Sequence, residues 1–248
     1  MQRLRPDASA PIGVLMFESA GDRIVGDPGM PGTFPFPIRY GMVPGSYRDL
    51  IHGSPQAREH LCMAAQKLEQ EGVAAIAGDC GLMALYQSDL AQSVSVPIIS
   101  SSLVLLPLAQ CLIGKNRKIG IITGHSQLLS TQHLLGASAD PSRLVIQGME
   151  DQPHFRQVVL EGTCPQDYQL MARDVLNAAK LLLERDETVG AILLECSNLT
   201  TFAREISNHY QIPVLDVNLA IQMLYLGRNH TDYQTINLGG IEHAVFRV

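Results

Sequence analysis

Short apolar runs alternate with longer amphipathic stretches along this chain, which predicts strands and helices in alternation. Continuous apolar runs, typical of strands buried on both faces of a parallel sheet, occupy 12–17, 73–77, 97–100, 118–123, 144–146, 189–194 and 213–217. Helical spacing or a helix-start signal predicts helices at 56–71, 82–92, 103–112, 126–135, 163–185, 199–210 and a last one ending near 227. This alternation predicts an α/β fold with parallel sheets.

One strand-to-turn pattern occurs twice. The sequence GVAAIAGDCGLM at 72–83 and the sequence VGAILLECSNL at 189–199 each lead an apolar run into a cysteine. Cys80 and Cys196 are 116 positions apart, and so are Pro97 and Pro213, which open the next apolar runs. The repeat predicts two similar lobes related by a pseudo-two-fold axis. We place them at 1–115 and 116–228, with a tail at 229–248 that packs back on the lobes.

The segment 18–46 interrupts this pattern. It contains the Gly- and Pro-rich sequence GDPGMPGTFPFPIRYGMVPGS, which cannot form a helix and predicts a long loop. The loop is either a rigid surface excursion or a wall over a site. Arg39, Tyr40 and Arg48 flank it and could clamp a substrate carboxylate, although a surface role is favoured for them.

Composition narrows the function classes. The formal net charge of −6 gives no reason to expect a nucleic-acid partner or an anionic membrane surface. Five cysteines and a polar amino-terminal stretch favour reduced thiols in the cytoplasm, and the longest apolar stretch is too polar to span a membrane. Histidines lack metal-ligand spacing, and no Gly-rich nucleotide motif follows a strand, so we expect neither a metal nor a cofactor.

Ligands of parallel α/β sheets bind beyond the carboxyl ends of the strands, where both repeated cysteines lie. Two lobes facing across a cleft would bring Cys80 and Cys196 to opposite sides of one small ligand. A helix amino terminus can lower a thiol pKa from about 8.5 to roughly 3.5–7.5. One thiolate and one thiol could then exchange a proton at an acidic carbon, which is racemisation without a cofactor. Candidate backbone donors to the developing enolate are Gly78, Gly81, Ser197 and Asn198.

Other polar residues lie near the same strand ends. Asp79 and Glu195 each precede a cysteine and are candidates for moving protons or orienting the thiol, although a capping or pairing role is equally compatible with their positions. His125 follows the strand at 118–123 and could face the cleft. We interpret Cys62 and Cys111 as packing residues on apolar helix faces.

The repeated strand-end cysteines, the IGVL opening and the IGIIT strand resemble the aspartate/glutamate/hydantoin racemase superfamily from about Pro11 to Gly227. The resemblance implies that Cys80 and Cys196 are the catalytic pair, working without pyridoxal phosphate. It also implies substrate contacts from Ser19, Thr123 and Ser197, and from Thr33 as in hydantoin-type relatives. Gly81-Leu82 and Ser197-Asn198 differ from the residues that glutamate racemases carry there, which argues against that substrate.

The sequence therefore predicts a racemase or epimerase of a small carboxylate-bearing amino acid or hydantoin-type compound. The resemblance also suggests a homo-oligomer. Two alternatives remain open: an isomerase or desulfurase in which one cysteine is the nucleophile, like maleate isomerase or a thiohydantoin-acid desulfurase, and a non-catalytic two-lobed binding protein. A product that is not the mirror image of the substrate would indicate the first, and two unreactive thiols the second.

Overall fold

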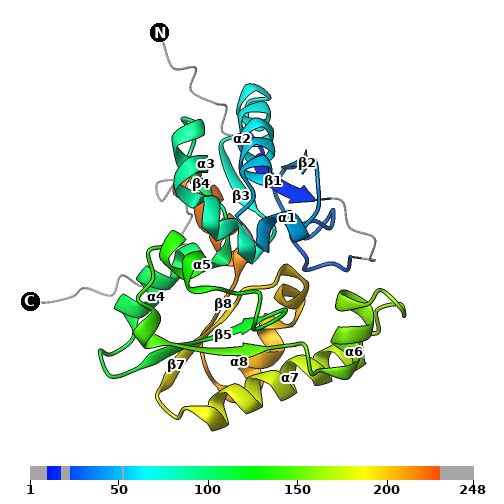
Figure 1. Ribbon diagram of the computed structural model, residues 1–248, viewed down its shortest axis with the longest axis vertical. Helices are drawn as coiled ribbons and strands as arrows, with labels where there is room; N and C mark the ends of the chain where they lie inside the picture. The colour runs from blue at the N-terminus through cyan, green and yellow to red at the C-terminus, as the bar shows by residue number, and fades with distance from the viewer. Residues whose placement is uncertain (1–9, 18–22, 52, 230–248) are drawn as a thin grey trace, which may run out of the picture.

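The computed structural model describes residues 10–17, 23–51 and 53–229, which form two lobes (Figure 1). Each lobe contains a four-stranded, fully parallel sheet with helices packed around it. The strand order is β2-β1-β3-β4 in the first sheet and β6-β5-β7-β8 in the second. The prediction of two similar α/β lobes is confirmed.

The strands match the predicted apolar runs, with one addition. The first sheet is built from β1 Ile12–Phe17, β2 Ile38–Val43, β3 Ala75–Gly78 and β4 Ile98–Ile99. The second is built from β5 Lys118–Thr123, β6 Leu144–Gly148, β7 Val189–Leu194 and β8 Val214–Leu215.

The predicted helices are present in their predicted order. Those of the first half are α1 Arg48–Ile51, α2 Pro55–Gln70, the 3-10 helix η1 Gly81–Tyr86, α3 Gln87–Ser93, the 3-10 helix η2 Ser102–Leu105 and α4 Leu106–Leu112. Those of the second half are α5 Thr131–Gly136, the 3-10 helix η3 Pro141–Arg143, α6 Pro153–Phe155, the π-helical turn η4 Arg156–Leu160, α7 Tyr168–Arg185, the 3-10 helix η5 Ser197–Phe202, α8 Ala203–Tyr210 and α9 Val217–Arg228. Of these, α1, η3, α6 and η4 are additions to the prediction.

Strand β2 corrects the prediction that 18–46 is a loop throughout. It pairs with β1 residue by residue, from Ile12 with Ile38 to Phe17 with Val43. As an edge strand it has few buried side chains, and prolines flank it at 37 and 44, where a missing N–H does not disturb the ladder. Prolines, which usually indicate a loop, therefore flank a strand at this position.

Two helix starts also lie later than predicted. Helix α5 begins after Ser130, whose side chain forms a capping box with His133, rather than at Ser126. Helix α7 begins after Asp167, whose carboxylate accepts a hydrogen bond from the Leu170 N–H at 2.9 Å, rather than near Thr163. In both cases a second capping residue lay further along the chain and closed the first turn.

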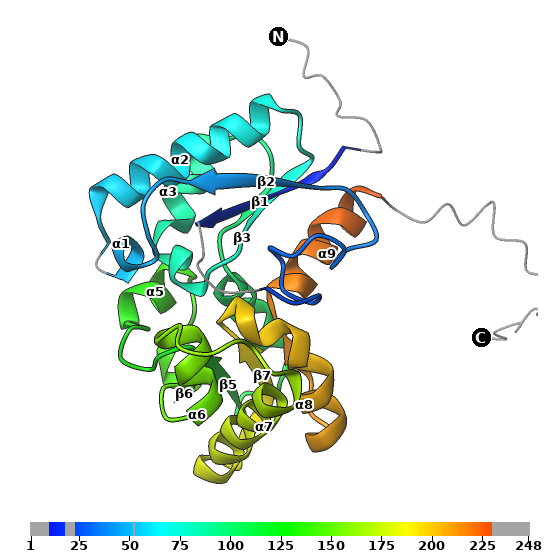
Figure 2. The same cartoon turned by 90° about the vertical axis from the view of Figure 1, so that its right-hand side faces the viewer.

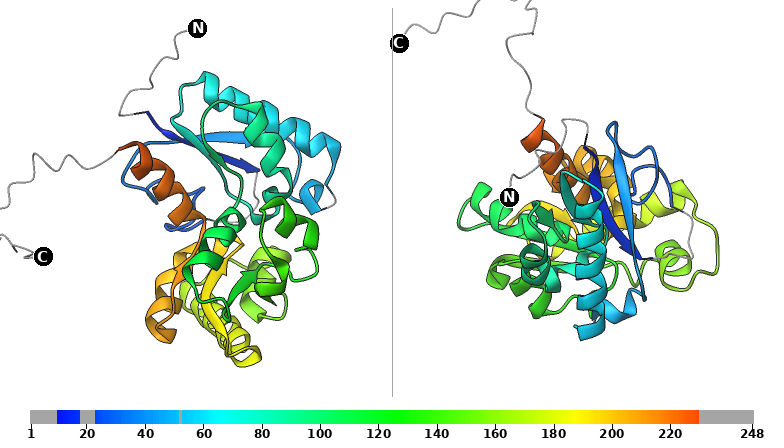
Figure 3. Two further views of the ribbon diagram at one scale, coloured as in Figure 1. Left: turned by 90° about the vertical axis from the view of Figure 1, so that its left-hand side faces the viewer. Right: turned by 90° about the horizontal axis from the view of Figure 1, so that it is seen from above.

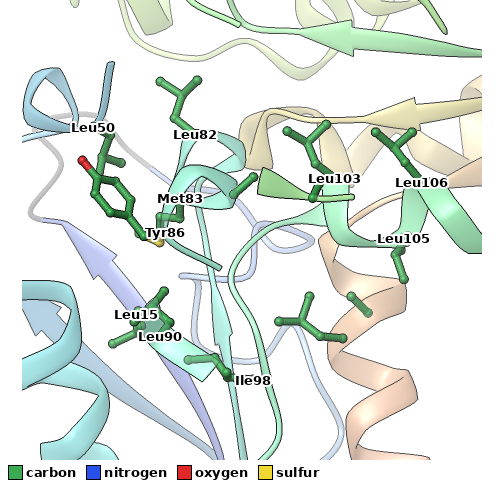
Figure 4. Close-up of a cluster of buried hydrophobic side chains, with 14 of the residues drawn as sticks. Leu15, Leu50, Leu82, Met83, Tyr86, Leu90, Ile98, Leu103, Leu105 and Leu106 are labelled. Atoms are coloured by element: carbon green, nitrogen blue, oxygen red, sulfur yellow. The ribbon is translucent and has the colours of Figure 1, made fainter. Parts of the chain in front are cut away.

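The lobes exchange their last helices. Segment η2–α4, from the first half, packs against β5 and β7 of the second sheet, and α9, from the second half, packs against β1 and β3 of the first. Figure 2 shows α9 beside the first sheet, and both views of Figure 3 place it with the first lobe. In Figure 4, Leu105 points toward α9 while Leu103 and Leu106 point toward the second lobe. One hydrophobic cluster consequently joins both lobes, from Leu15 to Leu193.

This exchange fixes the two sheets relative to each other, with the carboxyl ends of β3 and β7 facing the boundary between the lobes. Residues 217–228, which the sequence analysis placed in the second lobe, thus cover the first sheet. The predicted tail packing concerns residues 230–248, which lie outside the described residues. None of the helices described here is long and apolar enough to cross a membrane.

Candidate active site

Cys80 and Cys196 meet at the boundary between the lobes. Each lies two residues beyond the end of a central strand, β3 or β7, and immediately before a 3-10 helix, η1 or η5. The two residues form an isolated antiparallel bridge between the lobes. The predicted juxtaposition of the repeated cysteines is therefore present in the fold.

A cavity of about 800 Å³ opens beside this bridge and is lined from both lobes. The first lobe contributes Arg23, Tyr47, Cys80, Gly81 and Leu82. The second contributes Thr123, Gly124, His125, Leu128, Glu195, Cys196, Ser197, Asn198 and the segment 158–166. A volume of this size accommodates a small organic ligand.

Most of the predicted site residues line this cavity. They are Cys80, Gly81, Thr123, His125, Cys196, Ser197 and Asn198. Three others, Thr33, Gly78 and Asp79, do not line it. Ser19 lies outside the described residues.

Thr33 shapes a loop instead of contacting the cavity. Its hydroxyl accepts a hydrogen bond from the Gly26 N–H at 3.0 Å and donates to the Asp27 carbonyl at 2.7 Å. The prediction that Thr33 binds substrate is not supported by its position, because both hydrogen bonds close the loop on itself. The Gly- and Pro-rich loop that carries Thr33 turns this hydroxyl back onto the loop backbone.

Gly78 is required for packing. It is buried at the end of β3, where the backbone carbonyl of Ser100 lies against its Cα. A methyl group at this position would overlap that carbonyl and the sulfur of Met83. Its role is thus to let two backbone segments approach closely below the site, rather than to donate to substrate.

Replacing Gly78 with alanine should therefore lower the free energy of unfolding by about 1–3 kcal/mol, because the overlap with backbone cannot be relieved by a rotamer change. Urea unfolding measures the effect. Gly114→Ala is the matched control, since a methyl group there meets no atom within 4 Å. Equal urea midpoints for the two variants would contradict this account of Gly78.

Asp79 lies behind the cavity in an ionic network that sequence reasoning did not foresee. Its carboxylate is 1% exposed and accepts hydrogen bonds from the Arg23 guanidinium at 2.9 Å and the Tyr47 hydroxyl at 3.3 Å. Arg23 also donates to Asp27 at 2.6 Å. Burial raises the pKa of Asp79 to about 7, although Arg23 opposes the increase. Arg23 thus lines the cavity, but its positive charge is already paired with two carboxylates.

The Arg23 segment also connects the lobes close to Cys196. The Gly26 carbonyl accepts hydrogen bonds from the Thr200 hydroxyl and the Asn218 amide, both at 2.6 Å. The Val25 carbonyl accepts one from the Thr201 hydroxyl at 3.2 Å. This part of the segment 18–46 is therefore a strap between the lobes, with Arg23 as its contribution to the cavity wall.

The proposed carboxylate clamp at Arg39 is not present. Arg39 forms a surface ion pair with Glu71 at 3.2 Å, and neither it, Tyr40 nor Arg48 lines the cavity. Arg23 is the arginine that does, although no strand or spacing signal singled it out. The segment 158–166 was likewise missed, because its Val158 and Val159 lie on a π-helical turn before a loop.

Glu195 enters the cavity wall from the second lobe. Its carboxylate accepts hydrogen bonds from the Thr123 hydroxyl at 2.8 Å and from the Gly124 N–H. It lies directly over Gly81, where a methyl group would overlap it. Gly81 therefore allows the carboxyl of the second lobe to reach the Cys80 side of the boundary.

The surroundings of both thiols raise their pKa values, contrary to the prediction from helix position. Burial, reinforced by Glu195 and Asp79, raises the pKa of Cys80 well above its ordinary value. Burial and Glu195 raise the pKa of Cys196 to about 12, against hydrogen bonds from Asn198. The backbone N–H groups at the starts of η1 and η5 are therefore outweighed by burial and by negative charge.

Alkylation with iodoacetamide should accordingly label Cys80 and Cys196 more slowly than the exposed Cys111 at pH 8. Their rates should rise about tenfold per pH unit from pH 8 to pH 10, because only the thiolate reacts. Peptide mass spectrometry resolves the individual sites. A rate that reaches a plateau below pH 8 would mean that a thiolate is already present.

Two partly buried thiols on opposite lobes can hold and deliver protons on two faces of a bound carbon acid. In the parts of the chain that the structure describes, no group of three or more His, Cys, Asp or Glu side chains is placed to hold a metal ion. Thr123, Asn198 and Arg23 also line the cavity and carry hydrogen-bond donors.

The chain is similar to known proteins in sequence and in fold. The chain is 28% identical over 227 residues to a dimethylsulfoniopropionate lyase of Durusdinium sp. clade D, covering 88% of this chain and 75% of that protein. It is 29% identical to dimethylsulfoniopropionate lyase 6 of Emiliania huxleyi, covering 83% of this chain but only 56% of that protein.

The fold resembles allantoin racemase from Klebsiella pneumoniae, with a TM-score of 0.59 at 15% sequence identity, covering 87% of this chain and 86% of that one. The family model for Asp/Glu/Hydantoin racemase matches residues 53–224, which include both cysteines. The chain therefore belongs to the Asp/Glu/Hydantoin racemase family.

Proposed function

We propose that this protein removes the α-proton of a small carboxylate that carries a sulfonium group on its β-carbon and expels that group as a neutral thioether. Cys80 and Cys196 would be the acid/base pair. The observation that carries the proposal is the meeting of these two residues between the lobes, beside a cavity lined from both. The similarity to dimethylsulfoniopropionate lyases supports the substrate class.

The reaction balances without a cofactor. One cysteine, as the thiolate, takes the α-proton; the electrons of that C–H bond form the carbon–carbon double bond, and those of the C–S bond leave with sulfur. For dimethylsulfoniopropionate the products are acrylate, dimethyl sulfide and a proton. Arg23 and the Asn198 amide line the cavity and could receive the substrate carboxylate.

The charge of the site favours a cationic substrate. Asp27, Asp79 and Glu195 surround the two thiols, whereas Arg23 is already paired with the two aspartates. A sulfonium ion would offset the remaining negative charge. It would also lower the pKa of a facing thiol, and thereby supply the base that the unliganded site lacks.

Racemisation is the second candidate, and membership of the racemase family favours it. It shares the first step, since either thiol would remove an α-proton. The opposite thiol would then return a proton to the other face, so that no bond to a leaving group breaks. An amino acid or hydantoin substrate would fit this alternative.

The test is to incubate the purified protein with dimethylsulfoniopropionate and, separately, with D- and L-amino acids and 5-substituted hydantoins. Headspace gas chromatography detects dimethyl sulfide, and chiral chromatography detects inversion. We expect dimethyl sulfide and acrylate in equal amounts and no inversion. Inversion without dimethyl sulfide would establish the racemase alternative and overturn the proposal.

A further inference from the structure

Glu195 is a buried carboxyl group with no positive partner. It is 5% exposed, lines the cavity and receives its hydrogen bonds from the neutral groups Thr123 and Gly124. Within the described ranges, no lysine, arginine or histidine lies within 4.0 Å of its carboxylate. A buried charge without a partner is costly, so the position of Glu195 calls for a ligand or a proton to neutralise it.

The internal repeat allows Glu195 to be compared with its counterpart in the first lobe. Asp79 occupies the equivalent position before Cys80, yet it is paired with Arg23 at 2.9 Å and does not line the cavity. The two lobes thus place one carboxyl that is paired with a cation and one that is not beside their cysteines. Of the two, Glu195 is the one that lines the cavity.

We propose that Glu195 is the counter-ion for the cationic group of the substrate and sets the preference of the site for onium carboxylates. The inference rests on the proposed function and deepens it, because it assigns recognition of the positive charge to one residue. This class includes carboxylates whose β-carbon is bonded to a sulfonium sulfur or a quaternary ammonium nitrogen. Of the two groups, only the sulfonium is a good leaving group.

The surroundings of Glu195 suit this role. Cys80 and Gly81 face it from the first lobe, Cys196 adjoins it, and His125 follows the end of β5. Its negative charge raises the pKa of both cysteine thiols. A bound cation would cancel that effect, so Glu195 would keep the thiols protonated until a suitable substrate arrives.

Two carboxylate probes of equal shape isolate the charge of the head group: 3-(trimethylammonio)propanoate, the cationic probe, and 4,4-dimethylpentanoate, whose tert-butyl head group is uncharged and which is called the neutral probe. Isothermal titration calorimetry at pH 7.5 gives their dissociation constants for wild type, Glu195→Gln and Glu150→Gln. Glutamine keeps the shape of Glu195 and can accept from Thr123. Glu150 is the matched control, because it carries the same charge in the second lobe but is bonded to Ser126 away from the cavity lining.

We expect wild type to bind the cationic probe at least about 30-fold more tightly than the neutral one. Glu195→Gln should abolish this preference by weakening only the cationic probe, and Glu150→Gln should retain it. Equal binding of the two probes by wild type, or a preference that survives in Glu195→Gln, would overturn the proposal.

The outcomes separate this inference from the proposed reaction. Loss of the preference in Glu195→Gln, in a protein that releases no dimethyl sulfide, would support the counter-ion and reject the elimination. If the protein releases dimethyl sulfide but Glu195→Gln keeps the preference for the cationic probe, the elimination is supported and the counter-ion role is rejected. A second measurement is available in the absence of ligand: Glu195→Gln should speed alkylation of Cys80 and Cys196, since removing the carboxylate charge lowers the pKa of both thiols.

Discussion

Replacing either Cys80 or Cys196 by serine is expected to lower kcat for dimethyl sulfide release by about 10²–10⁴-fold. A serine hydroxyl has nearly the same shape, but it is a far weaker acid than a thiol and cannot supply the base. Each cysteine faces the cavity from a different lobe, so neither can take over the position of the other. Headspace gas chromatography under saturating substrate measures kcat for each variant.

Cys62→Ser and Cys111→Ser are the matched controls, because these cysteines lie on α2 and α4 outside the cavity lining. Both should retain wild-type kcat. The Cys80→Ser, Cys196→Ser double variant should be little worse than the poorer single variant, since residues that act as a unit are not additive. A single variant at Cys80 or Cys196 with full activity would remove that cysteine from the mechanism.

Arg23→Met is expected to reduce the free energy of unfolding at pH 8 by about 3–5 kcal/mol. The substitution keeps the bulk of the side chain but leaves Asp27 and Asp79 buried beside each other without a cation. The side chains of these aspartates are 3% and 0% exposed, so water cannot replace the lost partner. Urea unfolding measures the loss.

The same variant should recover stability as the pH falls. Burial already raises the pKa of Asp79 to about 7 in wild type, and removing Arg23 removes a cause that lowers it. An acid with a raised folded-state pKa binds more protons in the folded than in the unfolded state. Lowering the pH from 8 toward 5 therefore favours the folded variant.

The control for Arg23 is Arg39→Met, which breaks an exposed pair with Glu71. It should cost at most about 1 kcal/mol. If Arg23→Met lowers the free energy of unfolding equally at pH 8 and pH 5, the loss comes from packing and not from unpaired carboxylates. If it lowers this free energy as little as Arg39→Met does, the Arg23 ion pairs do not stabilise the fold.

The positions of the central strands could be predicted from the sequence because these strands are buried on both faces. Runs such as 118–123 and 189–194 have an apolar side chain at almost every position, and the 116-residue repeat linked the halves. Strand β2 was missed because it is an edge strand with half-exposed side chains and flanking prolines. Its pairing with β1 depends on the tertiary structure and cannot be predicted from local composition.

The exchange of α4 and α9 between the lobes also could not be predicted from the sequence. Apolar residues such as Leu106 and Ile221 indicate that a helix has a buried face, but periodicity does not say which sheet that face covers. Proximity along the chain suggested the nearer sheet. The structure instead pairs each helix with the sheet of the other half.

At the site, the cysteine pair was predictable because a strand end fixes where a side chain lies in a parallel sheet. Arg23 could not be found in this way, since the strap that carries it is positioned by the bonds of Gly26 to Thr200 and Asn218. The ionisation of the thiols was mispredicted for a different reason. Helix position alone suggested a low pKa, whereas burial and Glu195, which depend on tertiary structure, raise it.

Isotopic competition tests whether the reaction begins with removal of the α-proton. Dimethylsulfoniopropionate deuterated at the α-carbon, or at the β-carbon as a control, competes with unlabelled substrate, and product mass spectrometry gives the ratio of kcat/KM. We predict that α-deuteration slows the reaction distinctly more than β-deuteration does. Equal rates for all three substrates would contradict the claim that a thiol breaks the α-C–H bond.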